Sequence, residues 1–289
     1  MGKHAFLIIA HNDWSLLSKL LMCLDDKRNS IFVHIDKNSD FRYDNMYVPS
    51  EAECTYIERR KVMWGGESLI IVEMELIRAA VKSNQFDFLH LISGQDLPLK
   101  TQDEIHNWFD NFQGRNFISL DPDSNNQHTA IDRISRYWIF QDIVGRRKGI
   151  GFVLLRRLDR VLLKIQKMFK VDRTKKIPMK IYKGANWFSI TSDMAEEILS
   201  NQKQIMTWFG MGWCADELFL HTIAYNSSQR ETIINDSLRE IDWERGQPYT
   251  YTKEDKELLL KSEKLFARKF STTLDSEIID IVYNRAKGV

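Results

Sequence analysis

Two spacings of apolar residues alternate over the first 120 residues of the chain. Short apolar runs rich in Ile, Val and Phe are typical of buried strands, and apolar residues three or four positions apart are typical of helices. We expect strands at 5–10, 30–36, 55–58 and 86–93, and helices at 14–24, 69–81 and 101–112. Strands that alternate with helices predict an α/β fold with a mostly parallel central sheet.

Three polar residues stand at or near the ends of predicted strands, namely His11, Asp36 and Asp96. In parallel sheets, ligands sit beyond the carboxyl ends of the strands, so these side chains are candidates for binding. Asp36 could accept hydrogen bonds from a base or a ribose of a nucleotide. The alternative is that each residue caps the helix that follows. The glycine-rich dinucleotide fingerprint and the P-loop are both missing from the chain.

The segment 183–199 predicts a tight turn, a short strand and a helix capped by a hydroxyl side chain. Asn186 and Trp187 stand out at its start. A tryptophan beside an amide is a common way to hold a sugar, because the ring stacks on C–H groups while polar atoms bind hydroxyls. A tryptophan buried in the core is the alternative.

Two acids, Asp216 and Glu217, stand at the head of the apolar helical pattern WCADELFLHTI, residues 213–223. Acids in a first helical turn complement the helix dipole. Because neighbouring helical residues lie about 100° apart around the axis, one acid can cap the helix while the other faces a pocket. His221 follows Glu217 by four residues and would share its face. A single acid that faces a cleft would suit general-base chemistry.

Four cations lie near aromatic residues late in the chain, namely Arg239, Arg245, Arg268 and Lys269. A cation in apolar surroundings is costly unless it is paired, and a diphosphate is a natural partner. A solvated charged surface is the alternative.

Metal-binding signals are weak. Asp121 and Asp123 form an Asp-x-Asp pair, an arrangement that can bind Mg²⁺ or Mn²⁺ together with a diphosphate, but a loop is the default interpretation. The three cysteines lie far apart and contain no CxxC pair, which favours reduced thiols over a disulfide framework or a zinc site.

The formal net charge of +1 argues against general nucleic-acid binding, but it hides a strongly basic segment. Residues 146–176 contain twelve Lys/Arg and two Asp, a local charge of +10, so the remainder carries −9. Apolar residues recur there every three or four positions between the cations. Such a basic amphipathic helix suits an anionic membrane surface, and a helix packed on its own domain gives the same pattern. No apolar run approaches the roughly 20 residues that span a bilayer.

The ordered motifs resemble the core-2/I-branching β-1,6-N-acetylglucosaminyltransferase family, which also contains the peptide O-xylosyltransferases. The matching segments are AFLIIAH, FVHIDKNSD, VMWGGES, LISGQDLPLKT, KGANWFSIT, CADELFLHTI, IDW and LFARKF. They cover residues 5–270, and their order makes the resemblance specific. It implies a GT-A-like single domain over 1–289, with a Rossmann-like nucleotide-binding half at 1–120 and an acceptor and catalytic half at 121–289.

The resemblance also implies an activity: an inverting, metal-independent transfer of a sugar from a UDP-sugar to a hydroxyl of a glycan acceptor. Our first expectation for the sugar is GlcNAc, and xylose is the alternative. Glu217 matches the general base of the family, which leaves Asp216 to cap the helix. We expect Trp213 and Leu218 to raise the pKa of Glu217 if the pocket is dry. No cofactor and no metal ion are expected.

Donor and acceptor residues follow from the same resemblance. Asp36 matches an acid that contacts uridine, and Trp64 falls where an aromatic ring lies near the base. Lys269 matches a lysine that neutralises the diphosphate, and its arginine partner is Arg239 or Arg245. The expected donor site comprises His11, Asp36, Trp64, Asp96, Arg239, Arg245, Arg268 and Lys269, and the expected acceptor site comprises Arg133, Arg136, Tyr137, Asn186 and Trp187.

The chain lacks the N-terminal anchor and cysteine-rich stem of the animal members, which suggests a bacterial enzyme of capsule or surface-glycan synthesis. We therefore expect a cytoplasmic protein, peripheral on the inner face of the membrane, that acts on a lipid-linked oligosaccharide. In that setting the basic segment 146–176 would contact anionic lipid. The rival interpretation is a non-catalytic, membrane-associated protein that binds a glycan or a nucleotide.

Overall fold

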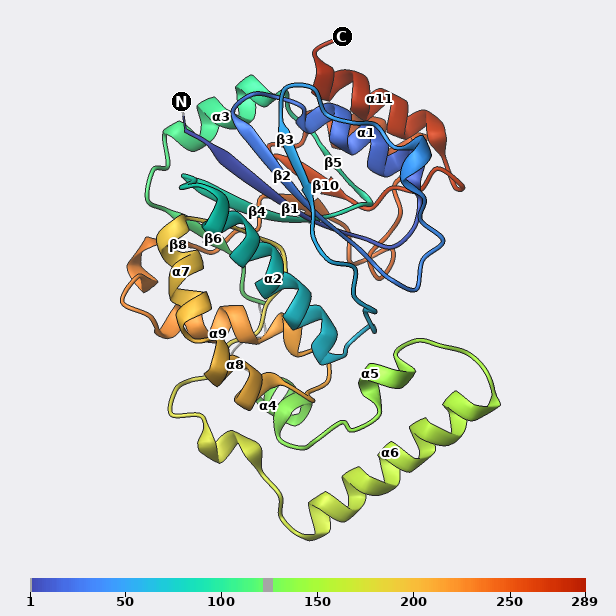
Figure 1. Ribbon diagram of the computed structural model, residues 1–289, viewed down its shortest axis with the longest axis vertical. Coiled ribbons are helices and arrows are strands. Elements are labelled where there is room, and N and C mark those ends of the chain that lie inside the picture. The colour runs from blue at the N-terminus through green and yellow to red at the C-terminus, as the bar shows by residue number, and fades with distance from the viewer. Residues whose placement is uncertain (1, 122–126) are drawn as a thin grey trace.

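A seven-stranded sheet forms the centre of the computed structural model, which describes residues 2–121 and 127–289 (Figure 1). Its strands are β1 (His4–Ala10), β2 (Asn29–Ile35), β3 (Glu53–Tyr56), β4 (Phe88–Ser93), β6 (Asn116–Ile118), β7 (Phe188–Ile190) and β8 (Ile233–Ile234). Their order is β3-β2-β1-β4-β7-β6-β8. The strands β1 to β4 run parallel to one another, β8 is parallel to β6, and β7 is antiparallel to both of its neighbours. The predicted α/β fold with a mostly parallel sheet is therefore confirmed.

A second, smaller sheet was not predicted from the sequence. It contains β5 (Asp96–Pro98), β9 (Arg239–Ile241) and β10 (Phe266–Arg268) in the order β5-β10-β9. The strand β10 is antiparallel to β5 and parallel to β9. Each strand has only three residues, which is too short for a periodic pattern to be recognised. This sheet brings Arg268 and Lys269, at the end of β10, close to the end of β4.

Helices cover both faces of the central sheet. They are α1 (Trp14–Leu24), α2 (Glu67–Ser83), α3 (Gln102–Asp110), α4 (Gln127–Ile134), α5 (Gln141–Val144), α6 (Ile150–Met168), α7 (Ser192–Ser200), α8 (Gln202–Phe209), α9 (Phe219–Asn226), α10 (Lys256–Lys261) and α11 (Ser276–Lys287). On one face α2 packs against α7, and on the other α1 packs against α11 (Figure 1). The long helix α6 lies apart from these layers, joined to them through α5 (Figure 1).

Two hydrophobic cores lie on opposite faces of the central sheet. Ala5 and Leu7 of β1 belong to the core under α2, whereas Phe6 and Ile8 belong to the core under α1 and α11. Because both faces of the strand are covered, β1 is apolar at successive positions instead of alternate ones. This burial explains why the strand appears as a continuous apolar run in the sequence.

The predicted elements of the first half are all present, and α1 has the bounds that were predicted. The predicted cap of the 183–199 segment is Thr191, whose side chain accepts a hydrogen bond from the N–H of Met194. The single helix predicted over 213–223 is wrong. Cys214 adopts a left-handed conformation with φ of 47°, and a short 3₁₀ helix, Ala215–Glu217, is followed by a break before α9 begins at Phe219.

Candidate active site

Two polar residues lie at the carboxyl edge of the central sheet, His11 directly after β1 and Asp36 directly after β2. Asp36 Oδ1 accepts hydrogen bonds from the backbone N–H groups of Asn38 at 2.9 Å and Val62 at 3.2 Å. These two bonds hold the carboxylate in one orientation. Within the described residues no group is hydrogen-bonded to its Oδ2, which is therefore available to a ligand.

Two cations, Arg268 and Lys269, lie near His11, and Arg146 lies near Lys269. Partial burial lowers the pKa of Lys269, and the nearby charges of Arg268 and Arg146 lower it further. Burial also lowers the pKa of His11; the charge of Asp36 opposes the shift, and the two neighbouring cations add to it. Among the residues that the structure describes, no carboxylate pairs with the Lys269 ammonium. Such a concentration of positive charge suits a diphosphate.

Asp96 holds Arg268 in place and does not face the site. The two residues lie opposite each other on β5 and β10, with Nη1 of Arg268 3.2 Å from Oδ1 of Asp96. Asp96 is fully buried and also accepts hydrogen bonds from the backbone N–H and the hydroxyl of Ser93. The predicted donor contact of Asp96 is therefore corrected: its oxygens are occupied by the protein.

Trp187 likewise supports Arg268. Its side chain belongs to the hydrophobic core, and the guanidinium lies over the ring at 3.9 Å from the centroid. A cation over one face of a largely buried tryptophan leaves no open platform for a sugar. The prediction that Trp187 stacks on an acceptor is therefore corrected, and the core alternative describes this residue.

Two arginines were candidates for a diphosphate, and the structure separates them. Arg239 is buried between the two sheets, where it donates to the Ser189 hydroxyl at 2.8 Å and to the carbonyls of Leu91 at 3.0 Å and Phe188 at 2.8 Å. Burial lowers its pKa to about 9. Arg239 therefore binds backbone and cannot reach a donor, which corrects that assignment.

Arg245 is half-exposed on the loop after β9. It pairs with Asp242 at 2.5 Å and Asp255 at 2.7 Å, and it lies over the Tyr249 ring at 4.1 Å from the centroid. The carbonyl of Tyr249 accepts a hydrogen bond from the Lys269 backbone N–H at 3.4 Å. Arg245 is thus close to the cation cluster, but two carboxylates already neutralise it.

Three tryptophan rings contact one another and connect the cations with the surroundings of Glu217. The rings of Trp64 and Trp213 meet edge to face at 6.3 Å, and Trp138 stacks on Trp213 at 5.5 Å. The Arg146 guanidinium lies over the Trp64 ring at 3.9 Å. Trp64 is 43% exposed, so it presents ring surface to solvent, and its contact with a base stays a prediction.

Glu217 is an acid of this region that solvent can reach. Its side chain is 34% exposed, and Oε2 accepts a hydrogen bond from Nη1 of Arg133 at 2.5 Å. Nζ of Lys183 lies 3.8 Å from the same oxygen. In the described part of the chain no hydrogen bond reaches Oε1. Both cations lie beside Oε2, and Oε1 is the oxygen that remains to accept a proton.

Asp216, in contrast, points inward. It caps neither the 3₁₀ helix nor α9, which corrects the predicted cap. The Nδ2 of Asn186 lies 3.4 Å from Asp216 Oδ2 and 3.4 Å from Glu73 Oε1 and so bridges two buried carboxyl groups. Burial, together with the charge of Glu217, raises the pKa of Asp216 to about 7. Asn186 therefore serves this buried pair and not an acceptor.

His221 does not tune Glu217 as the helical spacing suggested. The break at Leu218 separates the two residues into different helices, and His221 is fully buried in α9. Burial lowers the pKa of His221 to about 4, so its imidazole is neutral at pH 7.

Asp216→Asn is expected to make stability less dependent on pH. The folded chain binds the Asp216 proton more tightly than the unfolded chain, so this stabilisation is present below about pH 4 and is lost as pH rises through about 7. The loss is on the order of 4 kcal/mol. Thermal unfolding should show the variant gaining on wild type between pH 4.5 and 8. The exposed Asp193→Asn is the control, and an equal difference at both pH values would contradict the burial of this carboxyl.

The other predicted acceptor residues, Arg133, Arg136 and Tyr137, do not all lie at the site. Arg133 lies at the site, with its guanidinium paired to Glu217 and 5.2 Å from the Trp213 ring centroid. Arg136 donates to the hydroxyl of Ser135 at 3.3 Å. Tyr137 stacks with Arg173 at 4.3 Å, and Arg173 in turn binds the carbonyl of Gly210. Within the described chain no contact joins Arg136 or Tyr137 to Glu217. Of these three residues, only Arg133 is therefore placed at the site.

The Asp-x-Asp pair is described in part. Asp121 pairs with Lys183, which connects it to Glu217, whereas Asp123 lies outside the described residues. Within 2–121 and 127–289, no group of three or more His, Cys, Asp or Glu side chains is arranged to hold a metal ion. Independence of a metal stays a prediction.

Sequence reasoning missed three members of the site: Arg146, Lys183 and Glu73. Arg146 was counted only as part of the basic segment, although it lies on Trp64 and near Lys269. Lys183 stands three residues before Asn186, in a segment that was already singled out. The signal for Glu73 was an acid among apolar residues on the buried face of α2, where ionised side chains are rare.

Comparison with known proteins identifies related sequences. Xylosyltransferase 1 of Rattus norvegicus is 21% identical over 312 residues, which cover 95% of this chain and 34% of that protein. Xylosyltransferase 2 of Homo sapiens is 22% identical over 315 residues, which cover 96% of this chain and 33% of that protein. The chain therefore spans about a third of the length of these relatives.

Among solved structures, residues 1–349 of S. aureus TarS align at a TM-score of 0.26 and 16% identity, over 41% of this chain and 36% of that chain. This overlap is too small to support an argument about fold or activity. The sequence model of the family described as Core-2/I-Branching enzyme matches residues 4–262, which is most of the chain. On that match, this chain belongs to the Core-2/I-Branching enzyme family.

Proposed function

We propose that this chain transfers a sugar from a UDP-sugar to a hydroxyl of a glycan acceptor, with inversion and without a metal ion. One observation carries the proposal. A partly exposed carboxylate, Glu217, is linked through the rings of Trp213 and Trp64 to a cluster of cations that includes Lys269. Membership of the family and the names of its relatives support the same activity.

The chemistry follows from this arrangement. The acceptor O–H gives its proton to Oε1 of Glu217 while its oxygen forms a bond to the anomeric carbon. The bond from that carbon to the diphosphate oxygen breaks on the opposite face, and UDP leaves with the electron pair. Lys269 and Arg146 stabilise the negative charge that develops on the diphosphate. Asp36 Oδ2 accepts a hydrogen bond from the uridine.

Arg133 and Lys183 have a supporting role in this proposal. Both lie beside Oε2 of Glu217, so they fix the orientation of the carboxylate and leave Oε1 to meet the acceptor. After the transfer, Glu217 gives the proton to a water molecule, and the restored carboxylate pairs again with the two cations.

The donor sugar is the finer question. GlcNAc remains our first proposal for the sugar, and UDP-xylose is a second donor to test because the relatives named above are xylosyltransferases. The acceptor is proposed only as a hydroxyl of a glycan near Arg133.

The test is release of UDP from a panel of UDP-sugars in the presence of EDTA. Turnover of one donor in EDTA would support a metal-independent transferase and identify the sugar. An absolute requirement for Mn²⁺ would contradict the proposal and bring Asp121 and Asp123 back as candidate ligands. Binding of UDP without turnover of any donor, with every candidate acceptor, would favour the non-catalytic alternative.

A further inference from the structure

The outer surface of α6 carries an apolar stripe that no described element covers. It consists of Ile150, Leu154, Leu158, Val161, Ile165 and Met168, which recur at intervals of three and four residues and are between 41% and 83% exposed. At 100° per residue these side chains fall within one third of the helix circumference. We call this set the α6 stripe.

A different side of α6 faces the protein. Asp159 is the buried residue of the helix, and its carboxylate accepts a hydrogen bond from the backbone N–H of Phe140 at 3.4 Å. Gln166 exchanges hydrogen bonds with the backbone of Tyr137 at 2.8 and 2.9 Å. The helix is therefore fixed to the 137–145 region by the side that carries Asp159 and Gln166, where Leu155 and Leu162 are half-buried, and the α6 stripe points away from the protein.

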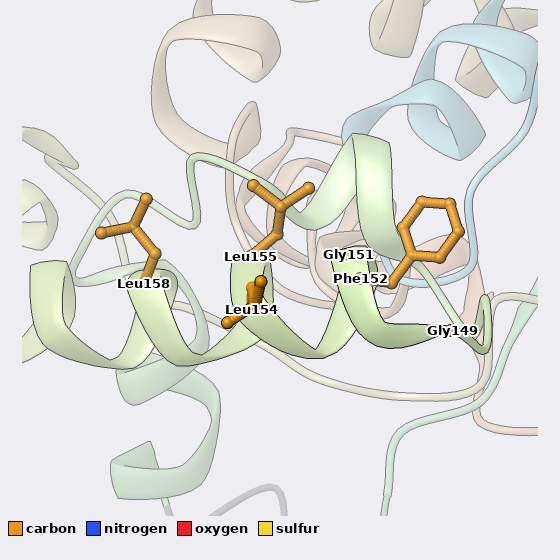
Figure 2. A pocket seen from close by; sticks show the side chains of 6 residues that line it. All are labelled: Gly149, Gly151, Phe152, Leu154, Leu155 and Leu158. Atoms are coloured by element: carbon orange, nitrogen blue, oxygen red, sulfur yellow. The ribbon is translucent and has the colours of Figure 1, made fainter.

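The first turns of the stripe border an open groove. Figure 2 shows the side chains of Phe152, Leu154, Leu155 and Leu158 around it, and the other lining residues are Gly149 and Gly151. All of these residues lie within 149–158, so the chain supplies one wall and no opposing wall. An exposed apolar surface of this kind is unusual on a protein that has no partner.

Cations flank the stripe along one side. Arg157, Arg160, Lys164 and Lys167 are exposed and follow the stripe along the helix, and we call them the basic flank. The acid within the helix, Asp159, is on the buried side. An apolar stripe beside a row of cations is complementary to a surface that is apolar inside and anionic outside.

We propose that α6 binds in the plane of an anionic lipid surface, with the α6 stripe among the acyl chains and the basic flank at the headgroups. At 19 residues the helix would extend about 28 Å along that surface. The α6 stripe and the basic flank run side by side along the helix, which suits contact in the plane of the surface. None of the helices within 2–121 and 127–289 has the length and apolar content of a membrane span.

The basic flank favours an anionic lipid surface, and not a second copy of the chain, as the partner of the α6 stripe. Two antiparallel α6 helices packed stripe to stripe would lie about 8–10 Å apart, about one Debye length at physiological salt, with both basic flanks on the same side, where like charges repel. A parallel pair would place the flanks on opposite sides, with no anion to neutralise either. An anionic lipid surface instead neutralises the flank while it covers the stripe. The inference is independent of the proposed sugar transfer.

Flotation with vesicles of phosphatidylglycerol and phosphatidylcholine tests the inference at physiological salt, with phosphatidylcholine vesicles alongside. We expect wild type to float with the anionic vesicles and to remain in the bottom fraction when only neutral vesicles are present. Combining Leu154→Ser, Leu158→Ser and Val161→Ser should lower partitioning at least tenfold. Combining Arg157→Gln, Arg160→Gln and Lys164→Gln should lower it by a similar factor.

Matched variants control for hydropathy and charge. Val48→Ser, Leu258→Ser and Leu274→Ser replace equally exposed apolar residues on other elements, and Lys27→Gln, Lys203→Gln and Lys256→Gln remove the same charge elsewhere. Both controls should float like wild type. Because every substituted side chain is at the surface, circular dichroism should show unchanged folding. Failure of wild type to float, or full flotation of the stripe variant, would overturn the inference. If sedimentation shows that wild type is a dimer and the stripe variant is a monomer, the partner of the α6 stripe is a second copy of the chain.

Discussion

Replacing Glu217 with Gln is expected to lower the rate of sugar transfer by roughly 10²–10⁴-fold, because an amide cannot take the proton of the acceptor hydroxyl. The change keeps the shape of the side chain, and its amide oxygen can still accept the hydrogen bond of Arg133. Binding of UDP should therefore change little. The measurement is UDP release with the donor and acceptor at saturation, with calorimetry of UDP binding in parallel.

A second ion-paired glutamate provides the control for this prediction. Glu257 pairs with Lys261 at 2.9 Å on the exposed side of α10, and Glu257→Gln removes the same negative charge away from Glu217. That variant should retain wild-type turnover. If Glu217→Gln kept more than a tenth of the wild-type rate, the general base would have to be another group, or the acceptor would have to react without one.

Lys269→Ala should have an effect of similar size, a loss of roughly 10²–10³-fold in turnover. The lysine is a fixed positive charge beside the position proposed for the leaving diphosphate, and such charges act most strongly on the transition state. Lys269→Arg keeps the charge and should recover part of the rate. The exposed Lys261→Ala is the control for loss of a lysine, and the comparison should be made in EDTA.

The pH profile adds a second readout for Lys269. Its pKa lies below the ordinary lysine value, because of burial and the charges of Arg268 and Arg146. Deprotonation removes the positive charge, so turnover should fall at an alkaline pH lower than an ordinary lysine would require. In Lys269→Arg this fall should move to higher pH, since an arginine keeps its proton. An unchanged alkaline limb would argue against a role for the lysine charge.

The sequence predicted the central elements well because their burial leaves a regular pattern. Leu16, Leu17, Leu20 and Leu21 are all fully buried in α1, and their spacing gave the bounds of that helix. In β9 and β10 the pattern fails, since three residues contain no complete period. Their pairing depends on contacts between segments that are far apart in the chain, which local spacing does not describe.

Site residues were harder to predict because a residue type does not reveal which way its side chain points. Arg239 and Arg245 were equivalent in the sequence, but one fills the space between two sheets and the other pairs with acids at the surface. Asp216 and Glu217 are neighbours in one short 3₁₀ helix, where successive side chains point in different directions, so the first is buried and the second reaches solvent. Such differences arise from packing.

The position of β10 has a consequence for how the protein acquires its site during synthesis. Lys269 follows β10, and this strand is held between β5, which comes early, and β9. A nascent chain that has already folded its central sheet up to Ile234 still lacks this lysine and the Arg268 that joins it to Asp96. A domain generally folds as a unit. The cation cluster is therefore complete only once the segment 264–270 has left the ribosome, although every strand of the central sheet is synthesised before it.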